Sequence, residues 1–241
     1  MTPFQSAVND LKLQWREVAG YAVAVVAAQS LFRAADLAIH GGEGAWVSVV
    51  RFLALCMLAA AVSSLQAVFF TKLGKRIDYP VWRCGDAGEA LRRFFSLWLI
   101  LNLVVLATVS FHLRAMVSGA SDLAVTLEFL IMAMAALYIP LGACLMRRDV
   151  SASGDAASAF LPLLRQLRLV FPVMLLGIAQ LFLLRVLQFA VPMDTVRGLL
   201  LVTAADAPLA ALDCLMFAMM WRVLMHDREA SAAAEGSPFD F

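Results

Sequence analysis

Seven Asp, Glu and Arg side chains lie well inside the long apolar stretches of this sequence, and they are candidates for chemistry there. Six of them balance in sign, three arginines against three carboxylates: Arg33, Asp36, Arg51, Glu128, Arg185 and Asp206. The seventh, Asp213, has no arginine left over to pair with it. Charges in apolar surroundings are costly and rare, so each is by default paired or functional. The six balanced charges are therefore candidates for an intramembrane charge network.

These charges share one depth if each apolar stretch is a membrane helix. At a rise of about 1.5 Å per residue, five helices place a charge about 8–10 Å below the same surface. Arginine–carboxylate pairs could dock the helices, because the guanidinium fork grips a carboxylate with two hydrogen bonds. Long side chains could instead reach out to the membrane surface. The third hypothesis is a polar cavity, open to that surface, which binds a small anion or zwitterion.

Asp213 lies deeper than this layer. It follows Asp206 by seven residues and so occupies nearly the same helical face. Because no basic residue remains to pair with it, Asp213 is a candidate proton-titrating group, as a proton-linked transporter would need. The other interpretation is structural: a neutral Asp213 would form a hydrogen bond with a neighbour such as Asn102.

Six apolar stretches must position these groups. They cover about 17–39, 46–70, 94–112, 123–145, 169–191 and 199–224. Each is near the length of about 20 residues that a helix needs to cross a bilayer core. Hydrophobic residues make up 63% of the chain and charged residues 15%, more apolar than an average soluble domain. The sequence therefore predicts an all-α polytopic membrane bundle of about six transmembrane helices. It forms a single membrane domain over 1–225, followed by a flexible cytoplasmic tail over 226–241.

Basic residues are distributed unevenly between the connections. Of the 19 Lys and Arg residues, 14 lie in the N-terminal segment, the C-terminal end and the loops 71–93 and 146–168. Cytoplasmic loops are enriched in Lys and Arg, so both termini are predicted to be cytoplasmic, in a plasma or inner membrane. Residues 18–28 could also form a signal-peptide core, although Asp10 and Glu17 before them argue against cleavage.

A faint internal repeat precedes the third and fifth apolar stretches. Gly-Asp-Ala at 85–87 and again at 154–156 begins an amphipathic segment that leads into a membrane hairpin. Asp86 and Asp155 fit helix N-caps, and Glu89 fits a capping-box partner of Asp86. With the N-terminal segment as a degenerate third copy, the sequence predicts three hairpins, each preceded by a short interfacial helix. The alternative is that Gly-Asp-Ala is simply a common helix start.

No enzyme or metal motif was found in the sequence. His40, His112 and His226 do not form a metal-ligand cluster, and the four cysteines are scattered, so no metal or cofactor is expected. A net charge of +1 gives no reason to expect a nucleic-acid partner. The expected partners are the lipid bilayer and, as an open option, other membrane subunits. The leading hypothesis is a non-enzymatic membrane subunit or scaffold, or a small transporter component. The alternative is an intramembrane enzyme acting on a lipid-linked substrate.

Overall fold

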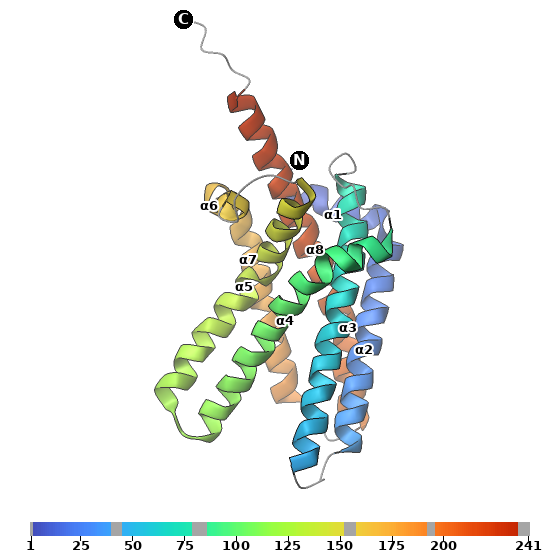
Figure 1. Cartoon of the computed structure of the whole chain (residues 1–241), viewed down its shortest axis with the longest axis vertical. Coiled ribbons are helices and arrows are strands. Elements are labelled where there is room, and N and C mark those ends of the chain that lie inside the picture. The colour runs from blue at the N-terminus through green and yellow to red at the C-terminus, as the bar shows by residue number, and fades with distance from the viewer. Residues whose placement is uncertain (1, 40–44, 79–85, 152–157, 192–195, 236–241) are drawn as a thin grey trace, which may run out of the picture.

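The structure, a computed structural model of the whole chain, describes residues 2–39, 45–78, 86–151, 158–191 and 196–235. Over these residues it is all-helical. Six helices are long and apolar enough to cross a membrane (Figure 1). They are α2 (Trp15–Ala38), α3 (Ala45–Ile77), α4 (Ala87–Val117), α5 (Ser121–Ser151), α7 (Leu167–Ala190) and α8 (Val196–Glu235). The predicted helical class and the six apolar helices are confirmed.

Three shorter elements accompany them in the described part of the chain. They are α1 (Pro3–Leu13), which precedes α2, and the 3-10 turn η1 (Ser158–Phe160) with α6 (Leu161–Arg165), which precede α7. Figure 1 shows both ends of the chain at the same end of the bundle, here called the termini end. The hairpins α2–α3, α4–α5 and α7–α8 have their connected helix ends at the opposite end, here called the far end.

The α4–α5 hairpin closes through a glycine at the far end. Gly119 has a φ of +74°, a left-handed conformation that glycine adopts without steric cost. The amide of Gly119 donates to the carbonyl of Met116 at 3.3 Å, and that of Ala120 donates to Ala115 at 3.0 Å. This is the Schellman pattern, which satisfies the last carbonyls of α4.

Helix boundaries agree with some of the predicted signals and depart from others. The N-cap predicted at Asp86 is confirmed, because its carboxylate accepts a hydrogen bond of 2.8 Å from the Glu89 amide. The N-cap predicted at Asp155 lies outside the described residues. The flexibility of the tail over 226–241 stays a prediction; the structure continues α8 to Glu235, and 236–241 lie outside the described residues. The segment is rich in Ala and Glu, which are strong helix formers.

The buried core is concentrated in the half of the bundle near the termini. Phe70 of α3 and Phe217 of α8 are both fully buried and stack at a centroid distance of 4.5 Å. Trp98 of α4 meets the Phe70 ring edge-on at 5.2 Å, and Trp221 stacks on Phe217 at 5.6 Å. We call these four residues the aromatic stack. Their packing holds α3, α4 and α8 together. Along α8, eight of the nine residues in 216–224 are buried.

Polar contacts tie α8 to its neighbours at the termini end as well. Arg222 binds Asp10 of α1 through two hydrogen bonds of 2.7 Å. Arg228 binds Asp78, at the end of α3, at 3.1 and 3.2 Å. Arg147 of α5 donates to the α8 backbone. Two-pronged arginine–carboxylate contacts fix orientation as well as distance, so this end of the bundle is held rigidly.

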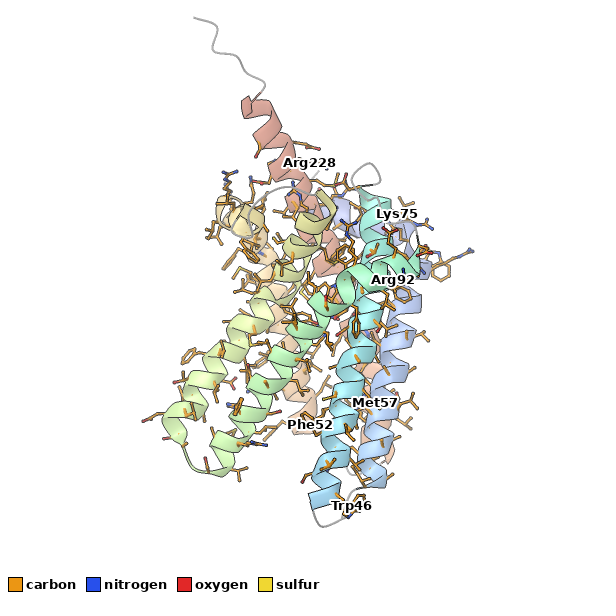
Figure 2. The ribbon with its side chains drawn as sticks, in the orientation of Figure 1. Trp46, Phe52, Met57, Lys75, Arg92 and Arg228 are labelled. Atoms are coloured by element: carbon orange, nitrogen blue, oxygen red, sulfur yellow. The ribbon has the colours of Figure 1, made fainter. Side chains whose placement is uncertain are left out.

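The surface of the long helices is apolar, as contact with lipid requires. Figure 2 shows Trp46, Phe52 and Met57 pointing away from the bundle along the far half of α3, and all three are exposed. A soluble protein rarely exposes such large contiguous apolar patches. This surface agrees with the length and composition of the helices.

Candidate functional site

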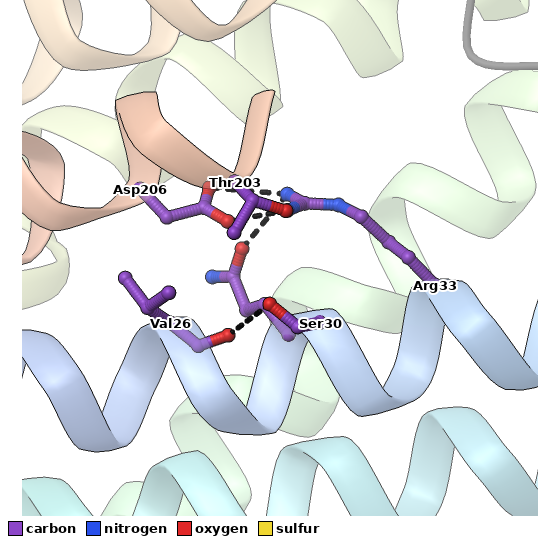
Figure 3. A network of polar contacts seen from close by, with 6 residues as sticks. Val26, Ser30, Arg33, Thr203 and Asp206 are labelled. Atoms are coloured by element: carbon purple, nitrogen blue, oxygen red, sulfur yellow. Dashed lines mark hydrogen bonds and ion pairs between the residues drawn. The ribbon is translucent and has the colours of Figure 1, made fainter. Parts of the chain in front are cut away.

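The most buried of the singled-out charges form one pair between α2 and α8 (Figure 3). Both terminal nitrogens of Arg33 bind the Asp206 carboxylate, with a distance of 3.0 Å from Nη2 to Oδ1. The guanidinium also donates to Gln29 at 3.0 Å and to Thr203 at 3.4 Å. The Asp206 side chain is only 2% exposed. This pair is largely enclosed, with the Arg33 side chain 16% exposed, and it joins the two helices in the far half.

The other two pairs are more open. Arg51 of α3 lies 3.0 Å from Asp36 of α2, and the two side chains are 44% and 46% exposed. Arg185 of α7 lies 2.8 Å from Glu128 of α5, whose second oxygen is 3.3 Å from Nε2 of His112. The structure thus brings each of the three arginines to a carboxylate of another helix. Among the described residues the six charges form three separate pairs.

Asp213 is held differently, by neutral side chains in the middle of α8. Gln180 of α7 donates to its Oδ1 at 2.9 Å, and the Tyr21 hydroxyl of α2 lies 3.5 Å from its Oδ2. Within the described residues Asp213 has no ion pair. Asn102, which the sequence suggested as its partner, makes other contacts.

Those contacts build a second polar group beside Asp213. Asn102 of α4 donates to Gln66 of α3 and to Ser63, both at 2.9 Å. The Tyr138 hydroxyl of α5 lies 2.7 Å from the Asn102 carbonyl oxygen and 2.9 Å from that of Gln66. A hydroxyl carries one proton, so it donates to one of these acceptors at a time.

The six long helices each contribute one residue to this region. We call the set the central polar cluster: Tyr21, Gln66, Asn102, Tyr138, Gln180 and Asp213. Only Asp213 was singled out as a site residue from the sequence. The available signal for the others was a lone neutral polar residue in an apolar run, which single-sequence reasoning does not separate from a helix contact.

A cavity of about 350 Å³ opens against the cluster. Its polar wall includes Gln66, Asn102, Tyr138, Gln180 and Asp213, together with Gln29, the residue that also binds Arg33. The apolar wall extends from the cluster toward the far end, along Val62, Val105, Val109, Ile131, Met134, Leu181 and Leu184. Asp213 carries the one charge in the described lining.

The lining sets what chemistry this site can do. One carboxylate, a phenol and several amides can bind an ammonium group or a neutral hydrogen-bonding group. The ionisable side chains in the described lining are Asp213 and Tyr138, and this lining holds no Ser, Cys, His or Lys. Within the described residues, no group of three or more His, Cys, Asp or Glu side chains is placed to hold a metal ion.

Comparison with known proteins gives no relative to argue from. No family model, curated protein or solved structure matches the chain. The function is therefore argued from the site itself.

Proposed function

We propose that this protein is a small membrane permease, or the substrate-binding subunit of one, and that it binds a small amphiphilic cation in its central cavity. The observation that carries the proposal is the environment of Asp213. It is an acidic side chain with only neutral hydrogen-bond partners among the described residues, and it faces a cavity at the meeting point of six helices.

The two walls of the cavity fit the two parts of such a ligand. A carboxylate in a region of low dielectric attracts an ammonium group far more strongly than it would in water. The amide and phenol oxygens around Asp213 can accept the remaining N–H donors. The valines, leucines and Met134 toward the far end suit an apolar tail. A volume of about 350 Å³ is within the usual range for small-molecule sites, about 300–1000 Å³.

In this proposal the three ion pairs of the charged layer control access to the cavity and do not bind the ligand. Arg33, Arg51 and Arg185 are each engaged by a carboxylate, and none of them lines the cavity. A cation therefore suits the site better than the anion or zwitterion considered from the sequence. The three pairs hold the far half together and lie where the cavity would open. Asp213 would hold the ammonium group of the ligand or, in the empty site, a proton.

The proposal includes an orientation and a repeat. The termini end faces the cytoplasm and the far end faces outside, which follows the distribution of Lys and Arg.

Three hairpins, each entered from the termini end, form the bundle. In support, the first and third are preceded by short helices that end at glutamines of nearly the same conformation. Gln14 has φ −115° and ψ 26°, and Gln166 has φ −108° and ψ 29°. The second hairpin differs, because α4 runs without a break from Ala87.

Three compounds that share a phenethyl skeleton test the charge of the ligand. Phenethylamine, phenethyl alcohol and phenylacetate differ in the head group and are offered to the purified protein in a neutral detergent, with binding followed by calorimetry. We expect phenethylamine to bind the most tightly. Tighter binding of phenylacetate, or no binding of any of the three, would overturn the proposal and leave the scaffold role.

Asp213→Asn tests the residue. It keeps the shape and much of the hydrogen bonding of Asp213 but removes the charge, and a hydrogen bond to a charged group contributes about 1.5–3 kcal/mol. We expect affinity for phenethylamine to fall at least about tenfold. Glu128→Gln is the matched control, since it makes the same change in an ion pair outside the cavity. Equal affinity in Asp213→Asn and the unmodified protein would remove Asp213 from the site.

A further inference from the structure

A second hollow lies at the termini end, between the start of α2 and the end of α3. It has a volume of about 610 Å³ and is lined by Glu17, Lys72, Lys75 and Arg76. The central cavity is lined by none of these residues. Three basic residues against one acidic residue make the basic hollow, as we call it, a region of net positive charge.

The groups around the basic hollow are held at known positions. Nη2 of Arg76 lies 2.9 Å from Oε1 of Glu17, and the Arg76 side chain remains 60% exposed. A guanidinium has five N–H donors, so this contact leaves donors for a ligand. The Lys72 ammonium lies 5.3 Å from the centroid of the Phe69 ring, within the range of a cation–π contact. The Phe69 ring thus stabilises the Lys72 ammonium group at the edge of the basic hollow.

The hollow lies where two membrane helices leave the apolar region. Glu17 is in the first turn of α2, and Lys75 and Arg76 are in the last turn of α3. Trp15 beside it is exposed, as is usual for aromatic residues at the level of lipid headgroups. Further along α2, Val23 is also exposed.

We propose that the basic hollow binds the headgroup of an anionic phospholipid, with its phosphate against Lys72, Lys75 and Arg76. Basic residues at a membrane surface attract anionic lipid, and a converging set holds one headgroup. Glu17 accepts a hydrogen bond from a headgroup hydroxyl, which favours a glycerol headgroup. The lipid bridges α2 and α3 at the end opposite to their connection.

The test compares two lipids of the same chain length in native mass spectrometry of the purified, delipidated protein. The probes are phosphatidylglycerol and phosphatidylcholine. We expect the unmodified protein to retain phosphatidylglycerol in preference to phosphatidylcholine. The double variant Lys72→Gln/Lys75→Gln is expected to lose about tenfold in phosphatidylglycerol affinity. Lys72→Arg/Lys75→Arg keeps the charge and is expected to keep the preference, which separates loss of a site from loss of folding.

Two arginines elsewhere at the termini end provide a control with the same charge. Arg165 and Arg168 are exposed residues of α6 and α7, and Arg165→Gln/Arg168→Gln removes the same charge. An equal loss of binding in this variant would mean a diffuse attraction and would overturn the proposal. Soluble glycerol 1-phosphate separates a lipid from a free phosphoester. If it bound as tightly as phosphatidylglycerol, the assignment to a lipid would be wrong.

Discussion

Near the termini end, eight of the nine residues of α8 in 216–224 are buried, whereas in the far half the same helix exposes Leu200 and Leu201. The first region contains the aromatic stack, and the second contains the cavity and the three ion pairs. In lipid, helices associate through close packing and hydrogen bonds rather than through the hydrophobic effect. The termini half therefore has the stronger cohesion, and the far half is the part that can open toward the cavity.

The arginine–carboxylate pairs of the molecule also differ in their number of contacts and in their exposure. At the termini end, Arg222 and Arg228 each bind a carboxylate with two hydrogen bonds. In the far half, Arg33 binds Asp206 in the same way, whereas the Arg51–Asp36 pair shows a single contact and is half exposed. A pair that is open to solvent stabilises a protein little, and an enclosed pair becomes costly when one partner is removed. The comparison thus predicts a ranking of how strongly substitutions in the two halves lower the free energy of unfolding.

The largest effect is expected in the aromatic stack. Trp221→Ala removes a fully buried ring that packs on Phe217, and such truncations cost about 3–5 kcal/mol of unfolding free energy. Denaturant unfolding in detergent measures the loss. Trp46→Ala is the matched control, because Trp46 is exposed at the far end of α3. Equal losses in the two variants would mean that the termini half is not the more cohesive one.

A smaller but clear loss is expected from Asp206→Asn. The change leaves the Arg33 guanidinium enclosed without a counter-charge, at a cost of about 3 kcal/mol. The same unfolding assay applies, with Asp36→Asn as a control in an exposed pair. If the two variants were equally stable, the enclosure of Asp206 would not matter to the far half.

The sequence predicted the helices well because the signal for a membrane helix is local. Twenty apolar residues in a row are sufficient, and the Gly-Asp-Ala motif at 85–87 located the N-cap of α4 correctly. The charges were also visible, because any charge in an apolar run stands out. The length of α8 was underestimated, since the apolar pattern ends near residue 224 while the helix continues to Glu235.

The partners of each residue could not be predicted in the same way. Which side chains meet depends on the rotation of each helix and on which helices are neighbours. The sequence of a single helix determines neither of these. Gln66, Asn102 and Tyr138 come from three helices. Their spacing of 36 residues is far longer than the period of a helix, so it does not indicate that the three side chains meet. From the sequence, His112 was considered only as a metal ligand, whereas the structure buries it against Glu128 of the next helix. The central cavity forms where six helices meet, so no local sequence pattern predicts it.

The smallest effect is expected from Arg51→Gln, and it tests where the open pair lies. Asp36 is in the last turn of α2 and Arg51 in the second turn of α3, a level that headgroups and water reach. At about half exposure, the pair should contribute no more than about 1 kcal/mol, and high salt should reduce even that. Unfolding of Arg51→Gln and the unmodified protein at low and high salt measures both quantities. A loss as large as that of Asp206→Asn, insensitive to salt, would place Arg51 and Asp36 in hydrocarbon. The far half would then be held by two strong pairs between α2 and its neighbours, and the cavity could not open between α2 and α3.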